Sequence, residues 1–392
     1  MQYFNEGRLV VKSWCEEPES GAIEQAVNLA NHPKAYHHIA LMPDTHQGYG
    51  MPIGGILAAV NAVIPNAVGV DIGCGMVALK TSIPVGDIST EKLKAVMGAM
   101  RKAIPVGFAH HQHAQDDRYM PEYSGVLDAD CPIVSQQYSK ALKQVGTLGG
   151  GNHFIEIQKG SDGFIWVMIH SGSRNLGKQV ADAYNKVAKD LNEKWCASVP
   201  LSWDLAFLPV DSSEGQSYLR EMQYCLDFAY CNRYLMMQRV TAILWDMFSA
   251  EITFDEAINI HHNYAVIEHH FGKNVWIHRK GATSARENEL GIIPGSQGSK
   301  SYIVKGKGSP ESFMSCSHGA GRAMSRKKAR ETLNLADEIA HMESRGIIHG
   351  MRSAKELDEA ASAYKDIDTV MREQQDLVDI VVELEPMAVI KG

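Results

Sequence analysis

One short glycine-rich segment combines residue types that bind divalent cations. In VGVDIGCGM, Asp71 and Cys74 stand three residues apart with glycines on both sides. A tight turn allows both side chains to converge on one point, and a carboxylate together with a thiolate suits a borderline divalent cation. The thiolate can also bridge two metal ions. The alternative interpretation is a buried structural cysteine in a glycine turn.

Histidines in glycine-rich surroundings offer further metal ligands. His153 follows GTLGGGN and precedes the alternating run Phe154–Ile157. This pattern predicts an imidazole at the junction of a loop and a strand, with Asn152 and Glu156 as hydrogen-bonding neighbours. The alternative is a hairpin turn that carries an incidental histidine.

Two other segments place histidines near polar groups. His170 ends the apolar run Phe164–His170, and the glycine/serine loop that follows carries Arg174. Donors so near a metal ligand suit a phosphate group, although a strand end with a solvent-facing arginine gives the same pattern. In INIHHNYA, the adjacent His261 and His262 point in different directions, so at most one of them is expected to bind a given metal.

Two segments near the C-terminal end are suited to phosphate groups. The glycines and serines of Gly291–Val304 could surround a nucleotide with backbone N–H and hydroxyl donors. In SCSHGAGRAMSR, His318 stands just before a Gly-Ala-Gly turn, and the pattern predicts a helix over Arg322–Thr332. The N-terminus of a helix favours phosphate, and Arg322 and Arg326 would lie one turn apart on one face.

Composition limits the classes of protein that this chain can belong to. Its 392 residues are 45% hydrophobic, which allows a large core, and the most apolar stretch, Gly54–Val70, is too interrupted to span a membrane. We therefore expect a cytoplasmic protein without a membrane partner. Seven scattered cysteines without a C-x-x-C pair exclude a zinc ribbon.

The charge distribution limits how the chain could bind nucleic acid. A net charge of −8 argues against an extended basic surface, so any contact with RNA must be local. The segment Lys300–Arg330 has eight basic residues against the single acid Glu311 and is the candidate for such a patch.

The expected fold mixes helices and strands without the alternation of a doubly wound sheet. Apolar periodicity predicts helices over Glu91–Ala103, Ile133–Gln144, Lys178–Trp195, Gln216–Phe248, Arg322–Thr332 and Leu335–Ser344. The long segment Gln216–Phe248 is apolar on several faces, so it should lie buried or pair with another helix. Neither a Rossmann fingerprint nor a P-loop motif is present. We expect an α+β fold, with one compact domain over residues 1–392 and a central metal site built from glycine-rich loops.

The order of these motifs resembles the RtcB family of RNA ligases. The matching segments, from about His38 to Gly392, are HIALMPDTHQGYGMPIGG, VGVDIGCGM, GTLGGGNHFIE, IHSGSRNLG, HHNYA, RKGATSA, GIIPGSQG, SHGAGRAMSR, AYKDID and the terminal VIKG. One departure lies in PGSQG, where the family commonly has methionine at the position of Gln297.

This resemblance implies an activity and a set of metal ligands. RtcB ligases use GTP and two manganese ions to join an RNA 3′-phosphate or 2′,3′-cyclic phosphate to a 5′-hydroxyl, in tRNA splicing or RNA repair. Asp71, Cys74 and His153 would hold one ion, and Cys74, His170 and His262 the other. His262 is preferred to His261 because the family's ligand stands directly before the asparagine.

The resemblance also implies a nucleophile, nucleotide contacts and RNA contacts. His318 would form a histidine–GMP adduct, from which GMP passes to the RNA 3′-phosphate. The other implied nucleotide contacts are Asn152, Glu156, Asn263, Ser296, Ser301, Gly319, Ala320, Gly321, Arg322 and Lys391. Arg174 and Arg326 are candidates for RNA phosphate, and an archease-like protein is a candidate activator. A penultimate lysine such as Lys391 would otherwise be a frayed, solvated end.

Two alternatives belong to other functional classes. A dinuclear metal phosphoesterase that acts on RNA cyclic phosphates would need the metal ligands, but neither His318 nor Lys391. A non-enzymatic RNA-binding protein would use the basic segment Lys300–Arg330 and leave the Asp/Cys/His set unexplained.

Overall fold

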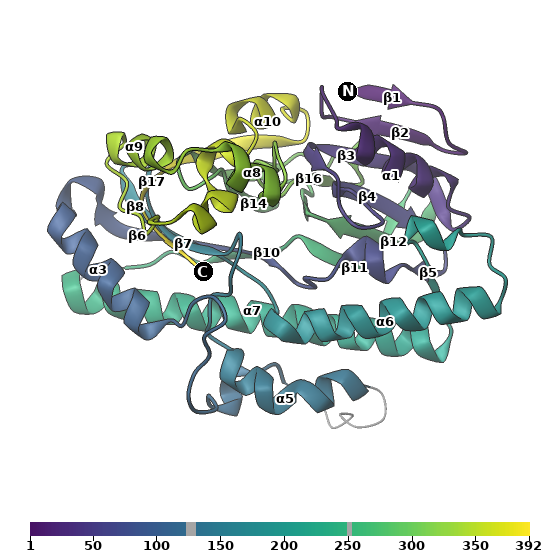
Figure 1. Ribbon diagram of the computed structural model, residues 1–392, viewed down its shortest axis with the longest axis horizontal. Coiled ribbons are helices and arrows are strands. Elements are labelled where there is room, and N and C mark those ends of the chain that lie inside the picture. Colours follow the sequence, from purple (N-terminus) through teal and green to yellow (C-terminus); the bar gives the residue numbers. More distant parts are fainter. Residues whose placement is uncertain (123–130, 249–252) are drawn as a thin grey trace.

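Two β-sheets form the centre of the computed structural model, which describes residues 1–122, 131–248 and 253–392 (Figure 1). The first sheet has the spatial order β1 (Gln2–Phe4), β2 (Val10–Ser13), β3 (Ala35–His46), β4 (Ile53–Ala59), β12 (Lys273–Lys280) and β11 (Asn263–His270). The second has the order β10 (Ile258–His261), β6 (Gly75–Pro84), β8 (Phe164–Ser171), β7 (Phe154–Gly160), β17 (Val378–Lys391), β15 (Ser301–Gly306) and β14 (Leu290–Ile293). Neighbouring strands are antiparallel except β2 and β3.

Helices and two small strand pairs complete the architecture. The α-helices are α1 (Ser20–Asn31), α2 (Pro65–Val68), α3 (Thr90–Ala103), α5 (Pro132–Gln144), α6 (Arg174–Lys194), α7 (Ser213–Phe248), α8 (Arg326–Thr332), α9 (Leu335–Ser344) and α10 (Ile367–Glu373). The 3₁₀ turns are η1 (Val85–Asp87), η2 (Asp117–Tyr119), η3 (Leu201–Trp203), η4 (Pro310–Ser312), η5 (Ala354–Glu359) and η6 (Ala361–Ala363). The small pairs join β5 (Ala62–Val63) to β9 (Leu208–Pro209) and β13 (Ala282–Ser284) to β16 (Ser315–Ser317).

The second sheet separates two cores because side chains alternate along its strands. In β8, Val167 and Ile169 pack in the core that also contains residues of α3 and α7, whereas Met168 belongs to the core on the opposite face. His170 stands two residues after Met168 in β8, and Glu156 pairs with Met168 across β7 and β8, so both side chains point to the same face as Met168. Both side chains therefore lie on the face away from α7, where the functional residues gather.

The longest helix, α7, lies buried as its composition predicts. It runs side by side with α6 beneath the sheets in Figure 1, and α5 lies below both helices. Tyr218, Phe228 and Leu244 from different parts of α7 have no exposed surface. The helix therefore acts as a central support, and its polar residues near the middle reach the loops of the site.

The expected fold class is confirmed: the structure is a single compact α+β domain. The predicted helices at α3, α5, α7 and α9 are confirmed within three residues at each end, and α6 begins four residues earlier than expected, at Arg174. None of the helices in the described part of the chain is both long enough and apolar enough to cross a membrane. The expected cytoplasmic location stays a prediction.

The helix expected over Arg322–Thr332 is wrong at its start. α8 begins only at Arg326, with the Ser325 side chain as its N-cap, and Arg322 instead forms an isolated β-bridge with Tyr364. The turn before it contains Gly321 at φ 71°, a left-handed conformation that does not start a helix. His318 therefore does not precede a helix N-terminus, and Arg322 and Arg326 do not share a helical face.

Candidate active site

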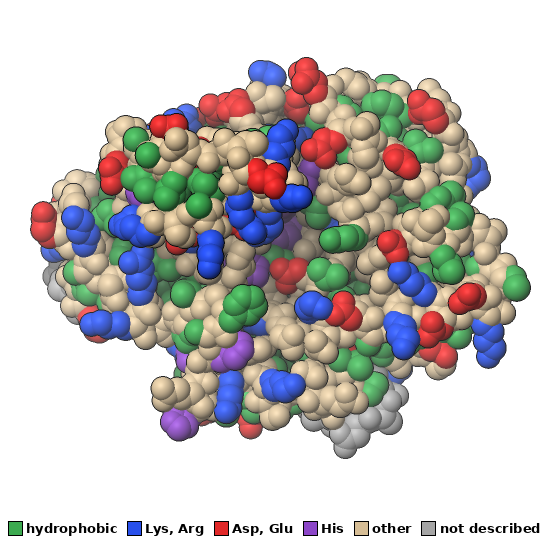
Figure 2. Space-filling model, viewed as in Figure 1, with side chains coloured by type: hydrophobic (Ala, Val, Ile, Leu, Met, Phe, Trp, Pro, Cys, Tyr) green, Lys and Arg blue, Asp and Glu red, His purple; other side chains and the backbone are tan. Residues whose placement is uncertain are grey.

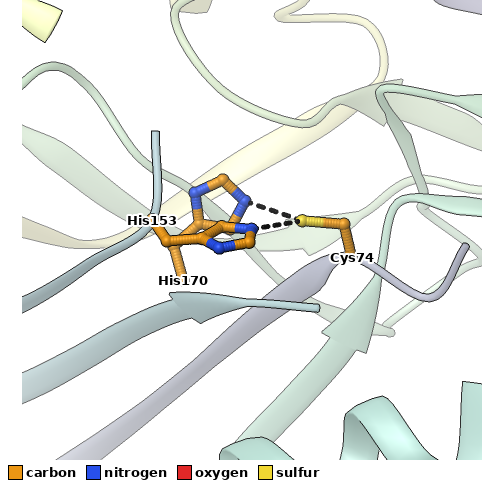
Figure 3. Close-up of side chains that lie close together, drawn as sticks. All are labelled: Cys74, His153 and His170. Carbon is orange, nitrogen blue, oxygen red and sulfur yellow. Dashed lines mark hydrogen bonds between the residues drawn. The ribbon is translucent and has the colours of Figure 1, made fainter. Parts of the chain in front are cut away.

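Three side chains form the centre of the site: His170 from strand β8, and Cys74 and His153 from the residues directly before strands β6 and β7 (Figure 3). The Cys74 Sγ atom lies 3.3 Å from His153 Nε2 and 3.2 Å from His170 Nε2. All three residues are buried, and their ligand atoms lie within 4.8 Å of one another. Two ligands of one tetrahedral ion with bonds of about 2.3 Å to sulfur and 2.0 Å to nitrogen are about 3.6 Å apart. The cluster therefore has nearly the dimensions of a metal centre.

The structure brings the other two expected ligands to the same place. Asp71 Oδ2 is 3.4 Å from His153 Nε2, and the His262 ring lies 5.1 Å from the His170 ring, centroid to centroid. His261, the neighbour of His262, points elsewhere and contacts Arg233 through Nδ1 at 3.1 Å. The two adjacent histidines do face different surroundings, as expected from their positions in the sequence.

The protonation and hydrogen bonding of these side chains suit a divalent cation. The Nδ1 atom of His170 lies 3.2 Å from the Asn152 carbonyl oxygen, so it donates and leaves the Nε2 lone pair for a metal. Burial and neighbouring histidines lower the pKa of His170 and His262 well below the usual range, so both rings are neutral. The buried Nδ1 atoms of His153 and His262 have no hydrogen-bond partner among the described residues. The donor set therefore fits a metal.

The thiol of Cys74 needs a cation to become a thiolate. Burial, and next the Asp71 carboxylate, raise its pKa well above the usual value. Binding of a metal would therefore release a proton from this sulfur.

Two neighbouring residues of α7 hold the loops that carry the ligands. Asn232 accepts a hydrogen bond from the backbone N–H of Thr147 at 3.1 Å. The fully buried Arg233 donates through Nη1 to the carbonyls of Gly73, at 3.0 Å, and Ser171, at 2.9 Å. Gly73 directly precedes the ligand Cys74, and Ser171 directly follows the ligand His170. A single helix thus fixes loops that are far apart in the sequence.

Close packing explains why the loops are rich in glycine. Gly149 has φ 92°, and a Cβ atom there would lie 2.2 Å from Arg174 Nη1 and 2.3 Å from His153 Nδ1. A Cβ atom on Gly172 would lie 2.6 Å from Asp71 Oδ1. Side chains at either position would displace candidate ligands.

His318 lies beside this cluster and is held by a buried carboxylate. Its ring is 4.8 Å from that of His262, centroid to centroid, and its Nδ1 atom is 2.6 Å from Oδ2 of Asp44. Asp44 has no exposed surface, and the same oxygen also accepts a hydrogen bond from the backbone N–H of His318 at 3.2 Å. Sequence reasoning did not single out Asp44, although it lies in the MPDTH part of the first matching motif.

Lys365 supports the segment that carries Asp44. Its Nζ atom donates to the carbonyls of Pro43, at 3.1 Å, and Thr45, at 2.7 Å, the residues on either side of the carboxylate. Its backbone N–H donates to the carbonyl of Gly321 at 3.0 Å. The AYKDID segment therefore ties the Asp44 strand to the glycine turn that follows His318, a role that only the folded chain reveals.

Glu156 begins a polar network next to the cluster. It is buried, and Gln158 Nε2 donates to its Oε2 atom at 2.7 Å and to Ser301 Oγ at 3.2 Å. Burial raises the pKa of Glu156 to about 8, an effect that the positive charge of Lys391 opposes. Glu156 and Ser301, two of the expected nucleotide contacts, are thus brought into one network.

A cavity of about 450 Å³ lies beside this network, with Arg101, Glu359 and Lys391 in its wall. Lys391 is held in strand β17 with its Nζ atom 3.6 Å from Glu359 Oε2, so it is not a frayed end. Arg322 and Arg326 also reach Glu359, at 3.5 and 2.7 Å. Three of the expected contact residues therefore converge on one carboxylate.

The other expected nucleotide contacts lie in loops that touch one another. Asn263 links two of them, because Nδ2 donates to the Asp71 carbonyl at 3.0 Å and Oδ1 accepts from Gly281 N–H at 2.8 Å. Ala320 N–H, between Gly319 and Gly321, donates at 2.9 Å to the carbonyl of Pro294, which begins the PGSQG loop. In that loop, Ser296 N–H donates to Ser299 Oγ at 2.7 Å, and Gln297 Nε2 donates to the Glu359 carbonyl at 2.7 Å.

Arg174 is half-buried and faces the loops of the site. Its Nε atom donates to Thr147 Oγ1 at 3.0 Å, and its Nη2 atom donates to the Gly107 carbonyl at 2.9 Å. The half-buried guanidinium therefore lies at the edge of the metal cluster.

The positive charge of the expected basic patch at Lys300–Arg330 is partly neutralised in the folded chain. Six of its eight basic residues pair with an acidic residue: Lys300 with Glu383, Lys307 with Asp379, Arg322 and Arg326 with Glu359, Lys327 with Glu331, and Arg330 with Asp358. Most of these acidic residues lie in η5 and β17, outside the segment whose charges were counted in the sequence. Lys and Arg side chains still gather beside the central hollow in Figure 2, where histidine side chains are visible.

Comparison with known proteins identifies the family of this chain. The family model described as "tRNA-splicing ligase RtcB" matches residues 25–392. The chain belongs to the RtcB family. The "RNA-splicing ligase RtcB" of Escherichia coli K12 is 39% identical over 408 residues, which cover 97% of each chain. The "tRNA-splicing ligase RtcB" of Thermococcus kodakarensis is 32% identical over 442 residues, or 94% of this chain and 91% of the relative.

Membership of the RtcB family agrees with the geometry of the site. The resemblance found in the sequence is confirmed, and with it the assignment of the chain as an RNA-splicing ligase that carries a candidate metal site.

Proposed function

We propose that this ligase joins RNA 3′-phosphate or 2′,3′-cyclic phosphate ends to 5′-hydroxyl ends with GTP, through a GMP adduct on His318. The observation that carries the proposal is the pairing of His318 with the buried Asp44 beside the Cys74–His153–His170 cluster. A hydrolase of cyclic phosphates would need the cluster but no nucleophilic histidine held in this way.

Asp44 prepares His318 to act as a nucleophile. The ring donates its Nδ1–H to the carboxylate, and the lone pair therefore lies on Nε2. Nε2 attacks the α-phosphorus of GTP, an N–P bond forms, and the bond to the β-phosphate oxygen breaks with release of pyrophosphate. The carboxylate stabilises the positive charge that the ring gains in this step.

Two manganese ions are assigned to the cluster. Asp71, Cys74 and His153 would hold one, and Cys74, His170 and His262 the other. When bound, the ions offset the negative charge of the phosphates that react. The thiolate is the only ligand of the set that both ions would share.

The nucleotide is assigned to the space between the cluster and the cavity. The Glu156 carboxyl group can accept a hydrogen bond from an N–H group of a guanine edge, and Lys391 can donate to an acceptor on the base. The further assigned contacts are Asn152, Asn263, Ser296, Ser301, Gly319, Ala320, Gly321 and Arg322. Because Asn263 and Arg322 already hold neighbouring loops, they would also position the residues around the nucleotide.

RNA completes the reaction. A 2′,3′-cyclic phosphate is first opened by water, which breaks the bond between phosphorus and O2′ and leaves a 3′-phosphate. An oxygen of the RNA 3′-phosphate then attacks the phosphorus of the adduct, and the N–P bond to His318 breaks. The 5′-hydroxyl then attacks the activated 3′-phosphorus and GMP leaves, so that one phosphodiester is formed. Arg174 and Arg326 are assigned to phosphates of the RNA.

The proposed activator is an archease-like protein, and the proposed location of the reaction is the cytoplasm.

The test is incubation of the protein with α-³²P-GTP and manganese in the absence of RNA. The proposal expects a labelled protein whose label moves to RNA when a 3′-phosphate end is added. Protein that joins such ends without ever carrying the label would contradict the proposed route.

A further inference from the structure

Phe108 is the most exposed large hydrophobic side chain in the described part of the chain. Its exposed fraction is 98%, and the neighbouring residues His110, Gln112 and His113 are also exposed. These neighbours are polar, so the ring does not belong to a broad apolar surface of the kind that binds another protein. A single aromatic ring among polar residues suits a flat, partly polar ligand such as a nucleobase.

The loop that presents this ring is held in place. Gly107 N–H donates to the carbonyl of Gly149 at 3.0 Å, and the carbonyl of Gly107 accepts from Arg174 Nη2 at 2.9 Å. Ala109 N–H donates to the carbonyl of Val106 at 3.1 Å. Both backbone neighbours of the ring are thus fixed, which lowers the entropy that is lost when a ligand binds.

Further along, the same loop is attached to the helical layer. His111 N–H donates to the carbonyl of Lys143 in α5 at 3.0 Å, and Arg239 of α7 contacts the His111 ring at 3.0 Å and Gln115 Oε1 at 2.7 Å. The exposed ring therefore stands on a braced segment and not on a loose one.

The loop lies between the metal cluster and the cavity. Gly107 bonds to Gly149, in the loop that leads to His153. A Cβ atom on Gly107 would lie 3.7 Å from the carbonyl carbon of Gly392, which lines the cavity. An RNA strand whose end reaches the metal cluster past Arg174 would cross this loop.

We propose that Phe108 is a stacking platform for an unpaired base of the RNA substrate next to the ends that are joined. This inference rests on the proposed function for the identity of the ligand. The ring would stack on the face of a base, while Arg174, which donates to the carbonyl of the neighbouring Gly107, binds a phosphate of the same RNA strand. Because every base has such a face, the platform selects unpaired ends and not a particular sequence.

The experiment compares three variants with the wild type. Phe108→Ala removes the ring, Phe108→Trp keeps a stacking surface, and Trp195→Ala removes an exposed aromatic ring at the far end of α6. Helix α6 begins at Arg174, and its 21 residues span about 30 Å, so Trp195 serves as a remote control. Both substituted side chains are at least 45% exposed in the wild type, so none of the changes disturbs the core.

We expect Phe108→Ala to raise the KM for single-stranded RNA ends roughly 5- to 150-fold, the range of base–aromatic stacking. Phe108→Trp and Trp195→Ala should stay within about twofold of the wild type. Removal of one base near the junction should raise the KM of the wild type but add nothing in Phe108→Ala. A KM in Phe108→Ala within twofold of the wild type, or equal sensitivity of both proteins to every abasic substrate, would overturn the proposal.

Two further measurements separate this inference from the proposed function. GMP labelling of the protein by GTP without RNA should be the same in Phe108→Ala as in the wild type, because the ring lies outside the nucleotide contacts. Binding of a 3′-phosphorylated RNA decamer should quench the additional tryptophan fluorescence of Phe108→Trp. If GTP does not label the wild type but RNA still quenches the fluorescence of Phe108→Trp, only the histidine–GMP route is contradicted. If GTP labels the wild type but RNA does not quench Phe108→Trp, only the platform is contradicted.

Discussion

Asp44 and His318 are joined by two hydrogen bonds to a single carboxylate oxygen, one from the backbone N–H of the histidine and one from its ring Nδ1 atom. The two contacts fix the histidine at the backbone and at the ring together. Lys365 holds the carbonyls on either side of Asp44, so the carboxylate is itself fixed. The tautomer of His318 is thereby set by the fold before any nucleotide binds.

Asp44→Asn should slow the formation of the GMP adduct by roughly 100-fold or more. An amide can donate to Nδ1, which would move the ring proton to Nε2 and block attack. The measurement is the single-turnover rate of labelling with α-³²P-GTP, with metal content as the control for an intact cluster. A rate within threefold of the wild type would show that the pairing does not set the tautomer.

His318→Ala should keep its fold and its metals but form no covalent adduct, because the five assigned ligands lie on other residues. The wild-type adduct should be acid-labile and base-stable, as a phosphoramidate is. The variant should still join RNA that is supplied with a preformed guanylylated 3′ end. An adduct that persists in the variant would refute the assignment, and one mapped to Lys391 would indicate lysine chemistry.

Cys74→Ala should lower metal content and all activity together, because the sulfur lies within 3.3 Å of both His153 and His170 and is assigned to both ions. Metal content is measured on purified protein by mass spectrometry after dialysis against manganese. Cys196→Ala is the matched control, because Cys196 is exposed and outside the cluster. A Cys74→Ala protein with two manganese equivalents and normal ligation would exclude a bridging thiolate.

The polarity of the ends that are joined follows from activation of a 3′-phosphate. RNA with a 3′-phosphate or cyclic phosphate and a 5′-hydroxyl should be sealed, and RNA with a 3′-hydroxyl and a 5′-phosphate should not. Both substrates can be compared in one gel assay with GTP and manganese. Efficient sealing of the second pair would assign the chain to a different reaction route.

Glu156→Gln should change the pH dependence of stability. Because burial raises the pKa of Glu156 to about 8, the folded protein keeps a proton that the unfolded chain loses above about pH 4.5. The wild type should therefore lose up to about 1.4 kcal/mol of unfolding free energy per pH unit between these values, relative to the variant. Urea unfolding of both metal-free proteins at pH 5 and pH 8 gives the difference. A difference that does not grow with pH would contradict the raised pKa.

Much of the fold could be predicted from local sequence patterns. Apolar periodicity located α3, α5, α7 and α9, and the run Phe164–His170 became strand β8 with one added residue. The start of α8 was missed because the turn at Gly321 is fixed by packing: a Cβ atom there would lie 2.2 Å from the carbonyl oxygen of Asp44. Such a contact joins residues that are far apart in the chain, and no local pattern contains it.

The residues of the candidate site likewise fall into those that the sequence predicted and those that only the folded chain reveals. Asp71, Cys74, His153, His170 and His262 could be selected because their residue types and glycine surroundings suit a metal, and the structure brings all five close together. Asp44 and Arg233 were missed because they act through partners that only folding supplies. The net charge of the basic segment at Lys300–Arg330 was overestimated for the same reason, since Asp358 and Glu359 lie outside it in the sequence.

Strand β17 has a consequence for how the protein is made. Residues 378–391 form the interior strand between β7 and β15, with Val389 opposite Glu156 and Leu384 opposite Ser301. A nascent chain that still lacks these residues exposes two unpaired strand edges, which are prone to aggregation. The sheet that carries Glu156 and Ser301 can therefore close only after more than 220 residues have followed β7 out of the ribosome, and the enzyme gains its site late in synthesis.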